Sequence, residues 1–568
     1  MLRAVAAFAV LGLAGLPPAP RSVVGPVPND TWAVGARFAV VAGEPRAARV
    51  GLDVLRSGGN AVDAAVAVSL ALAVTHPQAG NLGGGGFMLV RMADGEAAAF
   101  DYREKAPARA DRDMYLTEDG SVHADKSLVG ALAGGVPGSP AGLVSALEAF
   151  GTKDLAELAA PAIELARDGF EVDQFLAADL LEEREILGRF PSTRSVFFRD
   201  GEPLAVGDTL RQRDLAATLA RFAESGFHGF YRGETARRFA AHQAATGGII
   251  DEEDLAAYSP VRRQPLRGSY RGYEVLSMPP PSSGGVALLQ MLGMLEGFDM
   301  AGAGYQSARS IHWLVEVMRR AYADRARWLG DPDFYDVPVE GMLAPEYLRK
   351  LRASIEPDRV DAVVAGRPAG AKESDDTTHF SIVDGAGNVV SCTTTINSTF
   401  GSGLVVEGLG FFLNNEMDDF SAKPGVPNQF GLVGGEANAI QPGKRMLSSM
   451  TPTIVLHDGK PRLVLGAPGG SRIITGVLQV IVDVVDHGMP LRDAIAAPRV
   501  HHQWKPEHIM FERHAVPPDA RTRLEAIGHA FAREPLPSVG RVQAISIRSD
   551  GSRMAVCDPR SGGAAVAR

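Results

Sequence analysis

The fold of this sequence is decided by residues 375–381, DDTTHFS, where a polar segment ends at a threonine. The segment before it, residues 358–376, is poor in large apolar side chains and rich in glycine, proline and charge, which is typical of an exposed loop. From Thr377 onward β-branched residues dominate, and strands are predicted at 377–383 and 389–396. The chain therefore changes from exposed loop to sheet at a residue that carries a hydroxyl.

The turn at residues 384–388, DGAGN, fixes how these two strands pair. A turn centred on Ala386 places Thr377 directly opposite Thr395. Directly opposed residues have Cβ atoms about 4.5–5.5 Å apart, so this register brings a second hydroxyl close to the first. A slip of one residue would turn the two side chains to opposite faces. The alternative is a strand rich in threonine only because threonine favours β structure.

Further elements extend outward from this hairpin on both sides. The predicted helices are 44–56, 61–74, 286–295, 307–329, 473–485 and 519–527, with helical patterns dominant over 141–245. The predicted strands are 38–41, 87–91, 97–102, 273–278, 453–456 and 462–465, with a final hairpin over 542–556. Strands with helices on either side indicate a layered α/β architecture.

Composition limits the classes of function. The 568 residues are 45% hydrophobic and 22% charged, with a net charge of −10 and no basic stripe, so nucleic acid is not an expected partner. Two cysteines, Cys392 and Cys557, exclude a disulfide scaffold and a cysteine-rich zinc site, and we interpret both as buried small side chains. His501 and His502 would face opposite ways on a strand, so no metal site is expected there.

The N-terminus has the pattern of a signal peptide over residues 1–26. Arg3 supplies positive charge, residues 5–16 form an apolar run, and three prolines follow. That run is too short to span a bilayer, although an N-terminal anchor helix is the alternative. We therefore expect a mature protein that is periplasmic or secreted, with no stable membrane insertion once the leader is removed.

Several further segments complete a pattern that resembles the γ-glutamyltranspeptidases. No Gly-x-Ser-x-Gly elbow and no Walker loop compete with it. The matching segments are 101–107 (DYREKAP), 329–334 (LGDPDF), 377–397, 412–420 (FLNNEMDDF), 445–450 (RMLSSM), 466–472 (GAPGGSR) and 501–504 (HHQW). The resemblance covers nearly the whole mature chain.

The resemblance implies an αββα sandwich of the N-terminal-nucleophile hydrolase type, made as one chain that cuts itself between Asp376 and Thr377. The products would be a large subunit of residues 27–376 and a small subunit of residues 377–568, both parts of one interlocked domain. Cleavage would give Thr377 a free α-amino group, whose ordinary pKa of about 7.7–8.0 suits a general base. A threonine hydroxyl needs such a base to act as a nucleophile.

The resemblance also assigns the catalytic roles. Thr377 is the nucleophile, Thr395 aligns it, and the N–H groups of Gly469 and Gly470 hold the developing oxyanion near a helix N-terminus. His379, two residues along the strand, is a rival base, but we expect it to have a structural role.

A γ-glutamyl group ends in an α-carboxylate and an α-ammonium, so its pocket needs charges of both signs. The resemblance assigns it to Arg103, Asn397, Glu416, Asp419, Ser448 and Ser449. Arg103 can bind the carboxylate bidentately, with help from the two serines. Asp419 would neutralise the ammonium, with Asn397 and Glu416 beside it.

The implied reaction transfers the γ-glutamyl group of glutathione to water, or to an amino acid or peptide, without a metal or organic cofactor. A glutaryl or cephalosporin acylase of the same fold is the first alternative, although a glutaryl group has no ammonium for Asp419 to neutralise. A processed, non-catalytic binding protein is the second. The sequence departs from some family members at Glu416, where glutamine also occurs, and at Phe430 in the lid-like loop 424–435, where tyrosine is often found.

Overall fold

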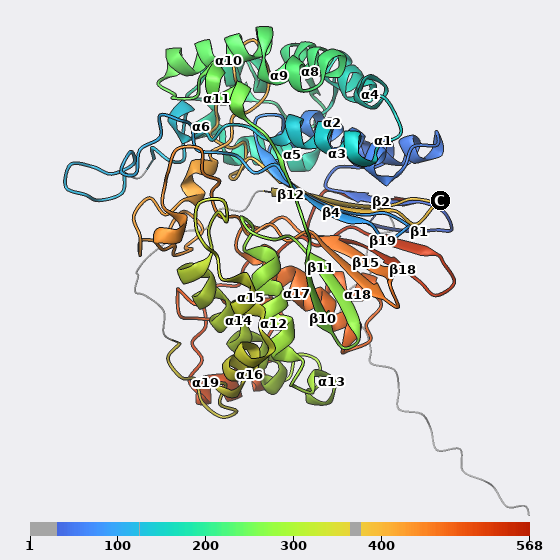
Figure 1. Cartoon of the computed structure of the whole chain (residues 1–568), viewed down its shortest axis with the longest axis vertical. Coiled ribbons are helices and arrows are strands. Elements are labelled where there is room, and N and C mark those ends of the chain that lie inside the picture. The colour runs from blue at the N-terminus through green and yellow to red at the C-terminus, as the bar shows by residue number, and fades with distance from the viewer. Residues whose placement is uncertain (1–30, 124, 364–376) are drawn as a thin grey trace, which may run out of the picture.

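The computed structural model describes residues 31–123, 125–363 and 377–568. The predicted leader at 1–26 and Asp376 lie outside the described residues. Two seven-stranded sheets lie face to face, with one layer of helices above them and another below (Figure 1). This arrangement is the predicted αββα sandwich.

The upper sheet contains the decisive hairpin at its centre. Its order is β20 (Ala564–Ala567), β2 (Ala39–Ala42), β12 (Thr377–Val383), β13 (Val389–Thr395), β3 (Gly85–Arg91), β4 (Ala97–Asp101) and β9 (Val261–Arg263), all antiparallel. β12 and β13 pair with Thr377 opposite Thr395, so the predicted register is confirmed. Strands from before and after residue 377 are interleaved in this sheet, with β12 and β13 between β2 and β3, which interlocks the two parts of the chain.

The lower sheet is also antiparallel throughout. Its order is β1 (Trp32–Gly35), β19 (Arg553–Val556), β18 (Gln543–Ile547), β15 (Lys460–Gly466), β14 (Thr453–His457), β11 (Tyr273–Ser277) and β10 (Leu266–Tyr270). Three two-stranded ribbons lie outside the large sheets: β5 (Phe170–Glu171) with β8 (Thr209–Leu210), β6 (Phe198–Arg199) with β7 (Glu202–Pro203), and β16 (Val500–His501) with β17 (Met510–Phe511).

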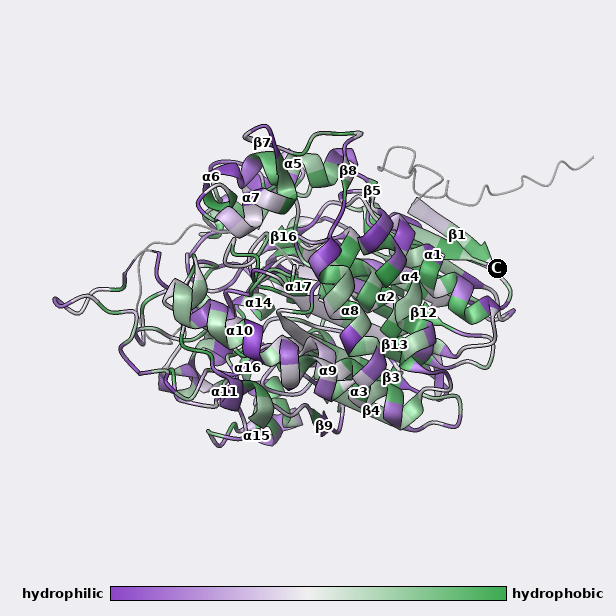
Figure 2. Cartoon of the chain, turned by 90° about the horizontal axis from the view of Figure 1, so that it is seen from above, coloured by the Kyte–Doolittle hydropathy of each residue, from purple (hydrophilic) through white to green (hydrophobic). Residues whose placement is uncertain are grey.

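The upper helical layer is built around one helix that is buried on every side. The layer comprises α1 (Pro45–Arg56), α2 (Ala61–Thr75), α3 (Ser139–Phe150), α4 (Leu155–Asp168), α5 (Gln174–Glu182), α6 (Arg184–Leu187), α7 (Pro191–Phe197), α8 (Arg213–Ser225), α9 (Phe227–Tyr231), α10 (Gly233–Thr246) and α11 (Glu252–Ala257). α2 begins at a capping box between Asn60 and Asp63. Asp63, the one charge in this apolar run, also accepts hydrogen bonds from Thr152. Figure 2 shows α2 within the hydrophobic interior of the layer.

The lower helical layer covers the second sheet. It comprises α12 (Gly284–Leu295), α13 (Met300–Ala303), α14 (Ala308–Trp328), α15 (Val339–Leu343), α16 (Pro345–Ala353), α17 (Arg472–Val485), α18 (Leu491–Ala496) and α19 (Pro518–Ala526). Its apolar side chains share one core with residues of both sheets, which places a continuous hydrophobic layer between the helices and the strands.

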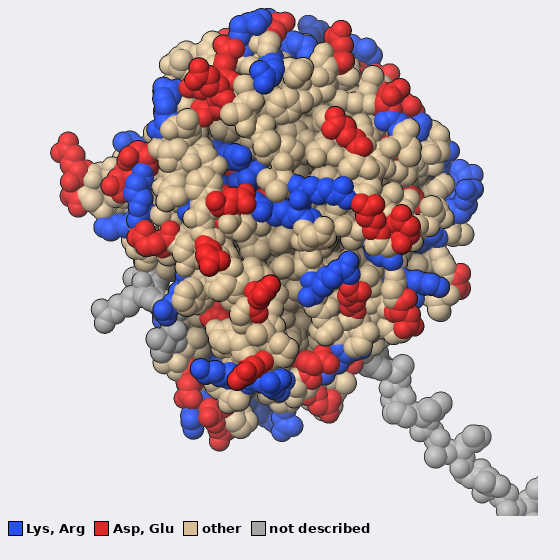
Figure 3. Space-filling model, viewed as in Figure 1, with Lys and Arg blue, Asp and Glu red and all other residues tan. Residues whose placement is uncertain are grey.

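The remaining expectations about the chain have mixed outcomes. Both cysteines are buried and unpaired, as interpreted, and the Cys392 thiol lies 3.1 Å from the Tyr102 hydroxyl. The edge strand β20 was not predicted. Among the described helices, none combines the length and apolarity needed to cross a bilayer. On the face shown in Figure 3 positive and negative side chains are interspersed.

Candidate active site

Thr377 stands at the first position of β12, and its side chain meets Thr395 across the hairpin. The Thr377 hydroxyl is 3.4 Å from Thr395 Oγ1, longer than the roughly 2.5–3.0 Å of a strong O–H···O hydrogen bond. Thr395 Oγ1 also accepts the backbone N–H of Asn397 at 2.8 Å. The second hydroxyl is therefore held by the backbone at the place where it can orient the first.

A small cavity opens beside these two hydroxyls. It is lined by Arg103, Thr377, Thr395, Asn397, Glu416, Asp419, Phe430, Ser448, Ser449, Met450, Gly470 and Ile473. Every catalytic and substrate-binding residue predicted from the sequence except Gly469 is among them. Met450 and Ile473 form an apolar wall that sequence reasoning did not identify.

Gly469 and Gly470 form the turn that leads into α17. Their φ angles are +135° and +51°, conformations that favour glycine. α17 begins at Arg472, whose N–H is bonded to the carbonyl of Gly469 at 2.9 Å. Within the described ranges, the backbone N–H groups of Gly469 and Gly470 donate no hydrogen bond. Two donors near a helix N-terminus suit a developing negative charge, although only Gly470 lines the cavity.

Arg103 lies at the centre of a buried group of charges that we call the site cluster: Arg103, Glu104, Glu416 and Asp419. Its guanidinium lies 2.6 Å from Glu416 Oε2 and 3.4 Å from Glu104 Oε2, and it also pairs with Asp419. Burial acts to lower the pKa of Arg103, but the carboxylates of Glu416, Glu104 and Asp419 outweigh it and raise the pKa. This guanidinium is therefore a fixed positive charge.

The carboxyl groups of the site cluster are harder to ionise than usual. Burial raises the pKa of Glu104 to about 7 and raises those of Glu416 and Asp419, while Arg103 pulls all three down. Glu416 Oε2 pairs with Arg103, and the Glu416 carboxyl also interacts with Thr395 and Asp419. Among the described residues, Oε1 of Glu104 has no hydrogen-bond partner.

The structure pairs two residues that the sequence assigned to opposite ends of the substrate. Arg103 was expected to bind the α-carboxylate and Asp419 the α-ammonium, and here the two side chains contact each other. A bound zwitterion can replace this ion pair with two new ones, because each of its charges has a partner of opposite sign in the cavity.

Ser449 is held by an arginine that sequence reasoning missed. Ser449 Oγ accepts a hydrogen bond from Arg325 at 3.2 Å, and Ser283 Oγ accepts one from Arg325 Nε at 2.9 Å. Ser448 Oγ accepts the N–H of Met450 at 3.1 Å. Arg325 is 4% exposed on α14. In the sequence, Arg325 is only an arginine in an amphipathic helix, and that pattern does not indicate which residues it will contact.

The alternative base, His379, is occupied by structural contacts. Its ring nitrogens lie 2.9 Å from Thr393 Oγ1 and 3.0 Å from Ser381 Oγ. Burial lowers the pKa of this histidine to about 3. The ring is therefore a neutral part of the sheet packing, in agreement with the structural role expected for it.

The loop 424–435 closes one side of the cavity through Phe430, which is 4% exposed. Gln503 Nε2 donates to the carbonyl of Phe430 at 3.0 Å, and Asn428 Nδ2 donates to Asp419 Oδ1 at 3.3 Å. The loop is therefore attached both to the 501–504 segment and to the site cluster, without a hydroxyl at position 430.

The sequence of this chain is similar to those of known proteins. A family model described as gamma-glutamyltranspeptidase matches residues 47–568. The glutathione hydrolase proenzyme of Escherichia coli (strain K12) is 48% identical over 99% of this chain and 98% of its own length. The acylase ACY 1 proenzyme of Pseudomonas sp. (strain SE83) is 39% identical over 94% of each chain.

Solved structures show the same similarity. Cephalosporin acylase from Bacillus halodurans superposes with a TM-score of 0.84 at 28% identity, over 97% of this chain and 99% of its own. A chain of Helicobacter pylori gamma-glutamyltranspeptidase, 43% identical, superposes with a TM-score of 0.56 over 59% of this chain and 95% of its own.

Proposed function

Because this chain belongs to the γ-glutamyltranspeptidase family, we propose that it is a self-cleaving glutathione hydrolase whose nucleophile is Thr377. The observation that carries the assignment is the position of Thr377 opposite Thr395, at the edge of a cavity that contains Arg103 and Asp419. A nucleophile and a pocket for a zwitterion occur together there.

The proposed maturation cuts the bond between Asp376 and Thr377 and yields subunits of residues 27–376 and 377–568. Central strands β12 and β13 belong to the second piece, while β2 and β3 on either side of them belong to the first. The inter-strand hydrogen bonds therefore hold the subunits together after the cut. They form one interlocked domain rather than two separable ones.

The proposed reaction begins when the α-amino group of Thr377 accepts the proton of its own hydroxyl. Oγ1 attacks the γ-carbonyl carbon, while Thr395 orients Oγ1 and the N–H groups of Gly469 and Gly470 stabilise the oxyanion. The leaving amine takes the proton, and a γ-glutamyl ester remains on Thr377. Water, or the amine of an amino acid or peptide, then releases the group.

Substrate recognition uses the charges already gathered in the cavity. Arg103 binds the α-carboxylate, and the hydroxyls of Ser448 and Ser449 donate to it. The α-ammonium lies against Asp419, with Glu416 and the side-chain carbonyl of Asn397 as further acceptors. The surplus of carboxyl groups around Arg103 supports this proposal, because an ammonium supplies the missing positive charge.

The proposed location is the periplasm or the exterior of the cell. It is supported by the sequence pattern of residues 1–26. From the proposed reaction and maturation, the partners are small γ-glutamyl compounds, acceptor amino acids or peptides, and the two subunits of one precursor.

The acylase alternative is favoured by the relatives named as acylases. Asp419 opposes it, because a glutaryl group would leave that carboxylate without its ammonium partner. Matched γ-glutamyl and glutaryl anilides separate the two activities. We expect the γ-glutamyl compound to be cleaved with the higher kcat/KM.

The decisive experiment is the intact mass and N-terminal sequence of the purified protein, compared with Thr377→Ala. We expect a fragment that begins Thr-Thr-His-Phe in the wild type, one uncut chain in the variant, and loss of measurable glutathione hydrolysis in the variant. An uncut wild-type chain would remove the α-amine and overturn the mechanism. A cut chain that never forms a γ-glutamyl ester would favour a binding protein instead.

A further inference from the structure

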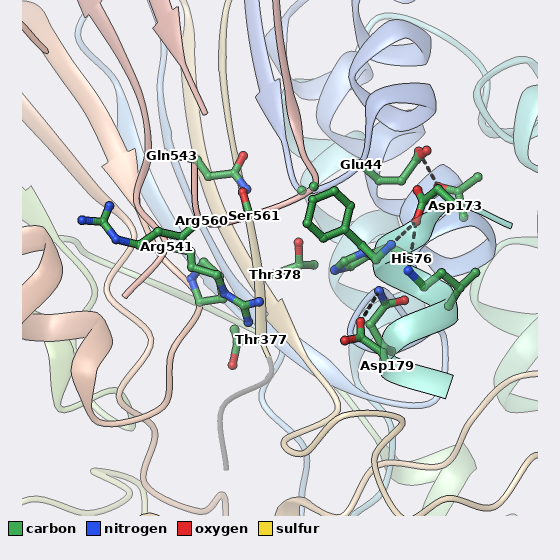
Figure 4. A pocket seen from close by; sticks show the side chains of 17 residues that line it. Glu44, His76, Asp173, Asp179, Thr377, Thr378, Arg541, Gln543, Arg560 and Ser561 are labelled. Carbon is green, nitrogen blue, oxygen red and sulfur yellow. Dashed lines mark hydrogen bonds between the residues drawn. The ribbon is translucent and has the colours of Figure 1, made fainter. Parts of the chain in front are cut away.

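The α-carboxylate of a bound γ-glutamyl group has to lie on one particular side of β12. Figure 4 shows the side chains of Thr377 and Thr378 pointing in opposite directions from this strand. The Thr377 hydroxyl lies beside Thr395, in the cavity of the site cluster, which we call the first cavity. A γ-glutamyl group that reacts with Thr377 Oγ1 therefore places its carboxylate in the first cavity, which Ser448 and Ser449 also line.

Both serines of the first cavity receive hydrogen bonds from the protein through their side-chain oxygens. Ser448 Oγ accepts the N–H of Met450 at 3.1 Å, and Ser449 Oγ accepts an N–H of Arg325 at 3.2 Å. Among the hydrogen bonds between described residues, neither hydroxyl is the donor. A hydroxyl has one proton and two acceptor sites. Each serine therefore keeps its proton for a group in the cavity, and a carboxylate, which only accepts, suits both.

Arg325 is fixed where its guanidinium can set the direction of the Ser449 hydroxyl. It lies on α14, is 4% exposed, and donates through Nε to Ser283 Oγ at 2.9 Å and through Nη2 to Ser449 Oγ. The planar guanidinium presents these two donors in a fixed relative geometry. Because Arg325 occupies one acceptor site of Ser449 Oγ, the O–H bond points away from Arg325. Ser449 lines the first cavity and Arg325 does not, so this direction leads into the cavity.

Ser283 extends the influence of Arg325 to the backbone of Ser448. The hydroxyl and the N–H of Ser283 both donate to the Ser448 carbonyl, at 2.6 and 2.7 Å. The Ser448 N–H in turn donates to the carbonyl of Pro281 at 2.9 Å. Since Ser283 Oγ also accepts from Arg325, one guanidinium orders the segments 281–283 and 448–449 together.

Arg325 also brings a second buried positive charge close to the site cluster. Burial lowers its pKa, against opposing contributions from Tyr322 and Asp419, and a guanidinium remains charged at neutral pH. A buried charge is costly unless an opposite charge compensates it. In the proposed complex Asp419 pairs with the substrate ammonium, so the α-carboxylate beside the two serines provides the compensating charge for Arg325.

We propose that Arg325 is a positioning residue for the α-carboxylate of the γ-glutamyl donor, an inference that rests on the proposed function. Arg325 acts without touching the substrate. It holds the Ser449 hydroxyl as a donor to the carboxylate, orders the backbone of Ser448 through Ser283, and adds positive charge behind both serines. A hydroxyl that accepts a hydrogen bond from a cation is also polarised into a stronger donor.

The test compares two substrates that differ only at this carboxylate: γ-glutamyl-p-nitroanilide and the same anilide with an α-carboxamide. We expect Arg325→Met to lower kcat/KM for the acid about tenfold, the effect of roughly one lost hydrogen bond to a charged group. For the amide, which has no negative charge to bind, kcat/KM should change less than about twofold. A purely structural role would lower both values by the same factor.

Arg325→Lys is the conservative variant, because it keeps the buried positive charge and loses the planar fork. It should recover part of the preference for the acid, with a loss of about threefold relative to the wild type. Because it retains the charge, it also gives a result if Arg325→Met does not fold. Arg327→Met is the matched control, since Arg327 is exposed on the same helix, and it should behave like the wild type.

The outcomes separate this inference from the proposed function. A wild-type enzyme that releases no p-nitroaniline from the γ-glutamyl anilide overturns the proposed function, and the inference with it. If the wild type is active and prefers the acid, the positioning role is overturned when the folded Arg325 variants keep that preference unchanged. A selective loss on the acid, partly restored by lysine and absent in Arg327→Met, supports it.

Discussion

Two buried groups of arginines and carboxylates in this protein differ in their balance of charge. One is the site cluster around Arg103. The other, which we call the C-terminal cluster, consists of Arg499, Glu512, Asp558 and Arg560. The site cluster has one arginine among three carboxyl groups, whereas the C-terminal cluster has two of each. Adding Arg325, which lies near Asp419, still leaves the site with more acid than base.

Both clusters contain a group without a hydrogen-bond partner among the described residues. In the C-terminal cluster, Arg499 donates to Asp558 and to the backbone carbonyls of Ile495, Val539 and Gly540, but its Nε donates no hydrogen bond. In the site cluster, Oε1 of Glu104 accepts none. The clusters therefore differ in charge balance: carboxyl groups are in excess only around Arg103, and a buried excess of one charge is costly unless a ligand or a proton compensates it.

Replacing the central arginine of each cluster gives the largest expected effects and tests this contrast directly. Arg103→Met should lower kcat/KM for a γ-glutamyl substrate about 10³-fold, because a buried, charged contact to the substrate is lost. Its stability loss should be smaller than that of Arg499→Met, because the carboxyl groups beside Arg103 already have raised pKa values and can take up protons.

Arg499→Met should instead lower the free energy of unfolding by about 3–5 kcal/mol, since it removes one of the two arginines paired with the buried Asp558 carboxylate and the donor to the carbonyls of Val539 and Gly540. Urea unfolding and steady-state kinetics on both variants provide the measurement. The contrast fails if Arg103→Met unfolds as readily as Arg499→Met, or if both variants keep normal kcat/KM.

Asp419→Asn tests whether the excess carboxyl groups of the site cluster bind the ammonium of the substrate. Removing this charge should reduce the preference for γ-glutamyl over glutaryl anilide by about 30-fold, equivalent to roughly 2 kcal/mol, because only the γ-glutamyl group has an ammonium to lose. The measurement is the ratio of the two kcat/KM values. Equal losses on both anilides would show that Asp419 positions the loop through Asn428 rather than recognising the ammonium.

The pH dependence of the stability of Glu104→Gln tests the same excess of carboxyl groups around Arg103. The folded-state pKa of Glu104 is raised to about 7 from 4.5, so the folded protein binds the proton more tightly than the unfolded chain. The stability from this protonated group is full below pH 4.5 and is lost as the pH rises through 7. Glutamine stays neutral, so its advantage over the wild type should grow from pH 5 to pH 8, on the order of 1–3 kcal/mol.

Urea unfolding at both pH values, with the exposed Glu182→Gln as control, measures this difference. Parallel stability curves for Glu104→Gln and the wild type would mean that Glu104 is ionised in the folded protein. The site would then have to accommodate a larger negative charge.

The parts of the structure that could be predicted depend on local chemistry or on long motifs. The turn at 384–388 sets the register of β12 and β13 without help from the rest of the chain, so the contact between Thr377 and Thr395 follows from counting residues. The polar lining of the first cavity followed from the family resemblance, whereas its apolar wall of Met450 and Ile473 did not. Both signals are strong because each involves several residues in a fixed order.

The parts that were missed depend on contacts between distant segments. Arg325 approaches Ser449 across 124 positions, and the four residues of β20 gain their strand conformation by pairing with β2 at the other end of the chain. Gln78 and Gln543, far apart in the sequence, line one cavity. Single residues of ordinary type carry no local pattern, so the sequence does not indicate where tertiary packing will bring them together.

Phe430→Tyr should have the smallest effect, and it asks whether the loop next to the site cluster needs a hydroxyl latch. The loop is already fixed by the bond from Gln503 to the Phe430 carbonyl and by the bond from Asn428 to Asp419. The ring also belongs to the same apolar core as Met450 and Ile473. We therefore expect kcat/KM to change by less than about threefold, which is roughly 0.6 kcal/mol.

Phe430→Ala is the matched comparison, because it keeps the backbone bond and removes the ring. It should lower kcat/KM more than Phe430→Tyr does, since water would enter beside Asp419 and weaken the charges that hold the substrate. If the tyrosine changes kcat/KM more than tenfold while the alanine does not, a hydroxyl at position 430 controls closure of the cavity. The contacts of Gln503 and Asn428 would then be too weak to hold the loop over the site cluster.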